Sequence, residues 1–345
     1  MKNRSQKSEF RKQKTEDRSK KSGTGRKAKL NDTVVFYILS IFCILSSVFF
    51  LLCSVSFAYE IHSKAAVVMD AATGKIFYAK NPDLKLPPAS TAKLMTAILV
   101  IENTILSDVV TISKNASRVS PHKVGFKAGE KVTVETLLYA ALLESANDAA
   151  IALAEAVAGS EKEFVELMNK KAVSIGAKNT RFANPHGLSK RGQYTTAYDL
   201  ARIMNYALTY PVLREIMRTR STEIFTIGGN ALFLKNTNKL LWSEEDLIGG
   251  KTGYTRRARH CFVGAAECED GIIIVTLLGS PSRRKLWKET GVLINKGIGA
   301  IEGREVPVAP YDTPDMKKVS YEKNISTDKK GKNLSRKSEK DKERL

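Results

Sequence analysis

The sequence predicts an α+β domain in which an antiparallel sheet is flanked by helices and carries a helical subdomain. Three observations in residues 60–300 predict it: short apolar runs separated by turn residues at both ends, Ala-rich helical patterns in the middle, and a closing amphipathic pattern. An isolated hairpin cannot bury its apolar face. We therefore expect the two end hairpins to pair into one sheet with the helices around it.

The expected elements follow in chain order. Ala65–Lys80 reads as two strands joined by a turn at residues 71–74, and a Pro-containing linker precedes a helix that begins at Ser90. Residues 134–158 read as buried helices with a polar interruption at residues 144–148. The remaining elements are helices near 164–172 and 196–208, strands at 248–254, 261–267 and 272–279, and a last helix at 282–298.

The two ends of the 345-residue chain are not expected to fold. Residues 1–32 hold twelve Lys and Arg against four Asp and Glu, and residues 301–345 hold twelve against nine. Such compositions bury too little apolar surface to offset the entropy of ordering them. We predict a basic, disordered start, one domain over residues 60–300, and a charged, disordered tail over 301–345.

An export segment is predicted over residues 33–58, because residues 34–58 contain no charged residue. About 20 apolar residues span a bilayer, and the preceding basic stretch fits the positive-inside rule. Residues beyond 59 would then lie on the extracytoplasmic side of a membrane. Ser56 and Ala58 suit a signal-peptide cleavage site, but both regions are longer than usual. A retained anchor and a cleaved signal stay open.

The net charge of +20 does not predict nucleic-acid binding, because no basic helix, RNA-binding strand motif or zinc spacing accompanies it. Affinity for anionic lipids or wall polymers would explain it as well. Cys261 and Cys268 lie seven apart without a C-x-x-C pair and read as apolar fillers. Neither a metal nor a cofactor is predicted.

The most informative local pattern is Ser90-Thr91-Ala92-Lys93. It places a hydroxyl at a helix start and an amine one turn later on the same face. Burial near a second cation would lower the pKa of such a lysine and let it act as a base. None of the four histidines accompanies a G-x-S-x-G elbow, so a Ser-His-Asp hydrolase is disfavoured.

Two further segments support a reactive serine. Ser145 and Asn147 interrupt an apolar helical stretch, where polar groups are destabilising unless partnered. Lys251-Thr252-Gly253 begins a strand; a cation and a hydroxyl there can hold a substrate carboxylate, while the glycine lets a ligand approach the backbone.

With these three motifs in this order, the sequence resembles the low-molecular-weight penicillin-binding proteins, serine-type D-alanyl-D-alanine carboxypeptidases of the peptidase S11 type. The likeness covers nearly all of residues 60–300 and includes the sequence segments PPASTAKLMTA, FANPHGL, TTAYDLA, NTNKLL, GGKTGYT and LLGSPSRRKLW. It implies a penicillin-binding, β-lactamase-like transpeptidase fold. The implied substrates are peptidoglycan stem peptides, and β-lactams would acylate the serine as inhibitors.

The resemblance also implies a role for each motif residue. Ser90 would attack the carbonyl between the terminal D-alanines, Lys93 would take its proton, and Ser145 would relay a proton to the departing D-alanine. The expected ligand-binding residues are Asn147 for the substrate backbone, Lys251 and Thr252 for the terminal carboxylate, Gly253 for close approach, and the N–H groups of Ser90 and Tyr254 for the oxyanion.

The sequence departs from the family in two places. Arg256-Arg257-Ala258-Arg259-His260 stands where small residues are common, so bulky cations would lie beside the site. Better-known members also carry a second β-rich domain and a C-terminal amphipathic helix, neither of which is expected here. Any membrane attachment is therefore expected through residues 34–58.

Three other activities stay open. A β-lactamase shares the fold and motifs, but Ala146 stands where class A enzymes have Asp. A non-enzymatic peptidoglycan-binding or penicillin-sensing module would not need the complete set of nucleophile motifs. Endopeptidase cleavage of D-alanine cross-links is a possible side activity of the same serine.

Overall fold

The computed structural model describes residues 32–53 and 59–304 of the chain, which divides into the units Met1–Tyr59 and Glu60–Leu345. In the first unit, helix α2 spans Asp32–Cys53. Among the helices described, none has both the length and the hydropathy needed to cross a membrane. Residues 54–58 lie outside the described residues, as do positions 1–31 and 305–345, which make up most of the predicted disordered ends 1–32 and 301–345. The export segment and the tails therefore stay predictions.

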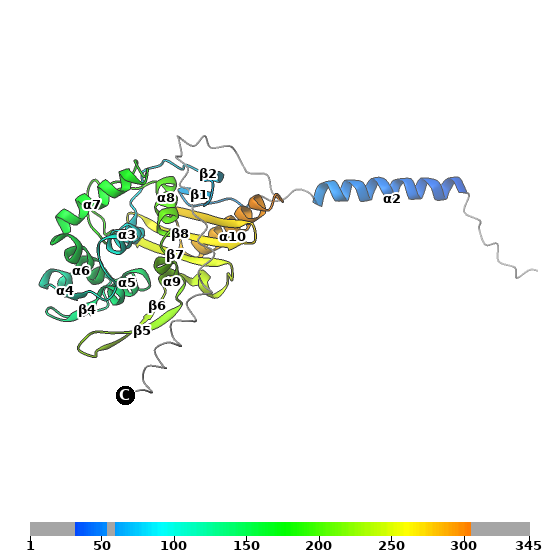
Figure 1. Cartoon of the computed structure of the whole chain (residues 1–345). Helices are drawn as coiled ribbons and strands as arrows, with labels where there is room; N and C mark the ends of the chain where they lie inside the picture. The colour runs from blue at the N-terminus through cyan, green and yellow to red at the C-terminus, as the bar shows by residue number, and fades with distance from the viewer. Residues whose placement is uncertain (1–31, 54–58, 305–345) are drawn as a thin grey trace, which may run out of the picture. The chain divides into compact units, whose positions relative to one another are not determined.

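One five-stranded antiparallel sheet joins the two ends of the second unit (Figure 1). Its strands run in the order β2-β1-β9-β8-β7. Their bounds are β1 Ala65–Asp70, β2 Ile76–Lys80, β7 Leu247–Thr255, β8 Arg259–Cys268 and β9 Gly271–Ser280. Strand β1 pairs with β9, with Val67 opposite Thr276, so the predicted pairing of the two end hairpins is confirmed.

Helices cover both faces of this sheet. Val67 and Met69 of β1 belong to one core cluster with Leu94 and Ile98 of the helical layer. The alternate residue Val68 faces helix α10 (Arg283–Ile301) instead, where a Cβ on Gly297 would lie 2.8 Å from its Cγ1. This alternation follows from the two-residue period of a strand. Because both faces are buried, the strands are apolar almost throughout.

The helical layer is built around α3, whose first eight residues, from Lys93 to Val100, are all buried. The helices are α3 Lys93–Asn103, α4 Lys114–Arg118, α5 Val134–Leu142, α6 Asn147–Ala158, α7 Glu161–Ser174, α8 Ala197–Ala207 and α9 Pro211–Arg218. Thr133, Ser160 and Thr196 cap α5, α7 and α8 through their side-chain oxygens, which is why these helices begin where they do.

Three features differ from the sequence-based expectation. Helices α4 and α9 were not expected. Ser90 does not cap a helix: it lies in the 3₁₀ turn η1 (Ala89–Ala92), which leads into α3 without a side-chain cap. The antiparallel strand pair β3–β4 (Val109–Thr111, Lys131–Thr133), whose strands are separated in the chain by α4, and the hairpin β5–β6 (Ser221–Phe225, Ala231–Lys235) were not expected either. Their strands are mostly exposed, so they lack the apolar pattern that identifies a buried strand.

Candidate active site

Ser90 is presented by a tightly packed backbone. Ala89, directly before it, has φ +48, in the left-handed region that a residue with a Cβ rarely adopts. Gly253 of β7 packs on the same turn: a Cβ there would lie 2.9 Å from Ser90 N. Such local strain is typical of functional sites. The sheet edge and the start of α3 thus fix the backbone N–H of Ser90.

Lys93 is completely buried one turn after Ser90, and its Nζ lies 3.3 Å from Ser90 Oγ. The same Nζ lies 2.6 Å from Asn147 Oδ1 and 2.9 Å from the carbonyl oxygen of His186. Burial, and then the charge of Lys251, hold the pKa of Lys93 well below its usual range, although Asp148 opposes them. A neutral amine has two N–H groups and one lone pair. With Asn147 and His186 accepting both N–H groups, the lone pair points to the Ser90 hydroxyl.

Ser145 and Asn147 lie where α5 gives way to α6. Ser145 has φ +63, and its Oγ is buried without a hydrogen-bond partner among the described residues. Asn147 donates from Nδ2 to the carbonyl oxygen of Pro121, at 2.6 Å, while its Oδ1 accepts from Lys93. The break therefore supplies an unsatisfied hydroxyl and an amide that fixes the lysine.

Asp148, which the motif analysis did not single out, orders the segment that holds Asn147. Its carboxylate accepts backbone N–H groups from Val124 (3.3 Å), Gly125 (2.9 Å) and Phe126 (3.2 Å). Just before these residues, the carbonyl oxygen of Pro121 accepts from the Asn147 side chain. Asp148 is fully buried, so its charge also acts on Lys93 without screening by water.

We expect Asp148→Asn to shift the pH dependence of Ser90 acylation to lower pH. The carboxylate raises the pKa of Lys93, so its removal lowers that pKa and leaves the lysine neutral in more acidic solution. The –NH2 group of the amide also faces backbone N–H groups from which it cannot accept a hydrogen bond, which should lower the free energy of unfolding by about 1 to 3 kcal/mol. Acylation rates against pH check this. Asp270→Asn, on the exposed β8–β9 turn, is the control; an unshifted pH profile for Asp148→Asn contradicts the prediction.

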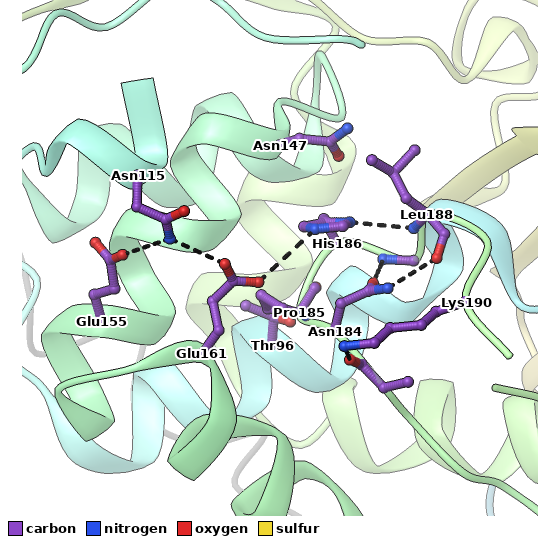
Figure 2. A network of polar contacts seen from close by, with 12 residues as sticks. Thr96, Asn115, Asn147, Glu155, Glu161, Asn184, Pro185, His186, Leu188 and Lys190 are labelled. Atoms are coloured by element: carbon purple, nitrogen blue, oxygen red, sulfur yellow. Dashed lines mark hydrogen bonds and ion pairs between the residues drawn. The ribbon is translucent and has the colours of Figure 1, made fainter. Parts of the chain in front are cut away.

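The loop that supplies the carbonyl oxygen of His186 is held by its own side chains (Figure 2). Gly187 N donates to Asn184 Oδ1 at 2.7 Å, and Leu188 N donates to His186 Nδ1 at 3.2 Å. Burial, helped by Lys93 and Lys190, lowers the pKa of His186 to about 3, so the imidazole is neutral. Its 4.0 Å approach to Glu161 is therefore a dipolar contact and not a salt bridge.

Lys251 and Thr252 lie on the edge strand β7. Lys251 is fully buried, and burial lowers its pKa to about 7 against the opposing effect of Glu144. Its Nζ donates to the carbonyl oxygen of Thr252 at 3.1 Å. The Thr252 hydroxyl lies 2.7 Å from that of Thr237, a residue that follows β6. A cation and two hydroxyls therefore gather next to Gly253.

Tyr254 ends the motif on the exposed side. Its side chain is 48% exposed and lies over His260 with ring centroids 4.5 Å apart. Tyr254 directly follows Gly253, which packs on Ser90 N, and the use of its N–H group for the oxyanion stays a prediction.

The fold joins most of the predicted residues into one site. Direct contacts connect Ser90, Lys93 and Asn147, Gly253 packs on Ser90, and Lys251 acts on Lys93 through its charge. No hydrogen bond joins Ser145 or Tyr254 to these side chains within the described residues. The motif analysis missed Asp148, the His186 carbonyl and Thr237. The last two lie within the segments FANPHGL and NTNKLL, which the resemblance identified without assigning a role to either residue.

Comparison with known proteins agrees with this site. The family model for peptidase S11, D-alanyl-D-alanine carboxypeptidase, matches residues 53–282. The D-alanyl-D-alanine carboxypeptidase DacF of Bacillus subtilis is 35% identical over 228 residues, which are 65% of this chain and 59% of DacF. DacC of Escherichia coli is 35% identical over 287 residues, 78% of this chain and 70% of DacC.

A solved structure has the same fold. The DD-transpeptidase of Streptomyces K15 superposes with a TM-score of 0.67 at 31% identity, covering 70% of this chain and 98% of that one. The predicted α+β, penicillin-binding type of fold is therefore confirmed. On the matched residues and these relatives, the chain belongs to the peptidase S11 family of D-alanyl-D-alanine carboxypeptidases.

Proposed function

We propose that the chain is a penicillin-binding serine carboxypeptidase that removes the terminal D-alanine from peptidoglycan stem peptides in cell-wall biogenesis. One observation carries the proposal: the buried Lys93 Nζ lies within hydrogen-bond distance of Asn147 Oδ1, of the His186 carbonyl oxygen and of Ser90 Oγ, the last at 3.3 Å. Once this amine is neutral, the first two oxygens accept its N–H groups and its lone pair is left for Ser90 Oγ. A lysine held in this way is a general base that needs no histidine.

The proposed reaction uses the motif residues in turn. Ser90 Oγ attacks the carbonyl between the two D-alanines while its proton moves to Lys93. The oxyanion is bound by the N–H groups of Ser90 and Tyr254, each worth roughly 3 kcal/mol in the barrier. The proton then passes through Ser145 to the leaving nitrogen, and D-alanine departs. Water hydrolyses the ester on Ser90 and leaves a stem one residue shorter.

The binding roles rest on charge and on unused hydrogen bonds. A protonated Lys251 with Thr252 would bind the terminal carboxylate, and Gly253 would let the substrate lie against β7. Asn147 has a second Nδ2–H group that no described residue accepts, and we assign it to the substrate backbone. The unpartnered Ser145 Oγ supports the relay, because a buried hydroxyl without a partner is destabilising unless a ligand supplies one.

Ser90→Ala should abolish both covalent labelling by a fluorescent penicillin and release of D-alanine from a stem pentapeptide, because among the described residues the Ser90 hydroxyl is the one that a buried lysine with a lowered pKa contacts. Labelling is read on a denaturing gel and D-alanine by a coupled assay. Ser117→Ala, at a half-buried position of α4, should match the wild type. Label on Ser90→Ala, or a folded wild type that takes no label, contradicts the proposal.

A second activity follows if the amine that leaves Ser90's substrate belongs to a cross-linked second stem peptide and not to a terminal D-alanine. The D-alanyl-D-alanine endopeptidase of Escherichia coli is 32% identical to this chain over 264 residues and matches 84% of its own length. Cleavage of a purified cross-linked muropeptide dimer would reveal the same activity here.

We further propose that residues 33–58 export the domain to the outer face of a bacterial membrane. N-terminal sequencing of the exported protein tests whether these residues are retained.

A further inference from the structure

A group of cations at the turn after β7 has no role in the reaction above. Arg256, Arg257 and Arg259 are all exposed, and the segment from Leu247 to Ala266 contains no Asp or Glu. Within the described part of the chain, none of the three arginines has an ion-pair partner. Neighbouring like charges repel one another, so their gathering favours a site that an anion occupies.

The turn is tied to a second basic segment. Thr255 Oγ1 accepts the backbone N–H of Ala258 at 3.0 Å, which closes the turn, and it also accepts the hydroxyl of Ser189 at 3.2 Å. Ser189 precedes Lys190 and Arg191, which are exposed as well. We call the five cations Lys190, Arg191, Arg256, Arg257 and Arg259 the cationic rim. The Thr255 contacts hold its two halves together.

The position of the rim relative to Ser90 follows from β7. Gly253 packs on Ser90 N, and Arg256 lies three residues further, in the turn that directly follows β7, which places it at most about 10 Å along the chain from Gly253. The terminal carboxylate of the substrate is assigned to Thr252 and the scissile carbonyl to the N–H groups of Ser90 and Tyr254. The part of the donor peptide that precedes the scissile carbonyl must extend from it in the direction away from the terminal carboxylate. It therefore runs along β7 toward Thr255 and the rim.

The field at this point is positive beyond the arginines themselves. His260, whose ring lies against Tyr254, has its pKa lowered by burial and by the charges of Arg283 and Arg259. A peptide that passes Tyr254 thus meets arginines that, among the described residues, form no ion pair with an acidic side chain. An arginine fork binds carboxylates with two parallel hydrogen bonds, which makes a carboxylate the ligand of choice.

We propose that the cationic rim binds a second carboxylate of the donor peptide, carried by the side chain of the residue that precedes D-alanyl-D-alanine. This selectivity rests on the proposed carboxypeptidase function and names its preferred substrates: stems whose third residue is an acid and not a neutral amide or an amine.

Two acetylated tripeptides test the proposal, Ac-L-Glu-D-Ala-D-Ala and Ac-L-Gln-D-Ala-D-Ala, which differ only in the charge of the first side chain. Wild-type kcat/KM for D-alanine release should favour the Glu peptide about fivefold, as expected for partly exposed ion pairs. The preference should shrink in 0.5 M salt, where the Debye length is about 4 to 5 Å. In Arg256→Gln/Arg257→Gln it should disappear, with kcat/KM for the Gln peptide unchanged.

The control removes the same charge elsewhere. Lys162→Gln/Lys170→Gln changes two exposed lysines of α7 and should retain the fivefold preference. A wild type that hydrolyses both peptides with equal kcat/KM overturns the rim proposal but leaves the carboxypeptidase intact. If the proposed carboxypeptidase function itself is wrong, the outcome is different: neither peptide releases D-alanine, and Ser90 takes no penicillin label. A preference that survives in the Arg256→Gln/Arg257→Gln variant also overturns the rim.

Discussion

Lys93→Met is expected to reduce acylation of Ser90 by at least about 10³-fold, the upper part of the range for loss of a general base. Methionine fills nearly the same volume, so the packing of α3 should survive while the only amine within reach of Ser90 Oγ among the described residues is lost. The second-order rate of labelling by a fluorescent penicillin measures the effect. A thermal melt separates it from misfolding, since Asn147 Oδ1 and the His186 carbonyl lose their donor.

The pH dependence gives this prediction a second readout. Acylation by the wild type should rise with pH while Lys93 loses its proton, a change that its lowered pKa brings into a less alkaline range. Above about pH 7, loss of the Lys251 proton should weaken carboxylate binding and raise KM. Lys93→Met should abolish the acid limb but keep the rise in KM. Lys170→Met is the control, and near-normal labelling of Lys93→Met would show that another group takes the proton.

The sequence predicted the sheet and most of the helical layer because those segments have strong periodicity. The strands at residues 248–254 and 261–267 and the helices around the break at 144–148 agree with the structure to within a few residues. The strand pair β3–β4 and the hairpin β5–β6 escaped prediction because most of their side chains are exposed or half-buried and carry no apolar pattern. Their ladder is fixed by backbone pairing instead.

The candidate site was predictable where side chains carry the chemistry and not where backbone does. Ser90, Lys93 and Asn147 could be chosen from their types and order. The acceptor that completes the Lys93 environment is the carbonyl oxygen of His186, which every residue possesses and no motif can single out. Asp148 was hidden for a related reason, because its partners are three backbone N–H groups of a loop that only the fold brings beside it.

Gly187→Ala should be among the most damaging changes outside the motif residues. Gly187 has φ +86, and a Cβ there would lie 1.7 Å from the carbonyl oxygen of Ala89, directly before Ser90. Because the carbonyl oxygen of Ala89 is a backbone atom and the added Cβ is fixed to the backbone of residue 187, relief requires moving either the His186 carbonyl from Lys93 or the turn that presents Ser90. Displacements of about 1 Å lower rates by about 10²-fold. We expect a loss of this size in penicillin labelling, with a lower melting temperature.

Gly192→Ala is the matched control, since Gly192 lies in the same loop region with φ +81 but has nothing within 4 Å of an added Cβ. It bears the conformational penalty alone, about 1 kcal/mol, and should label normally. The difference between the two variants therefore isolates the close approach of Gly187 to Ala89. If both lose the same stability and both label at the wild-type rate, the contact does not position Ser90. A selective loss of labelling in Gly187→Ala would instead mean that this loop sets the geometry of the Ser90–Lys93 pair from both sides, through the His186 carbonyl and through the backbone of the turn.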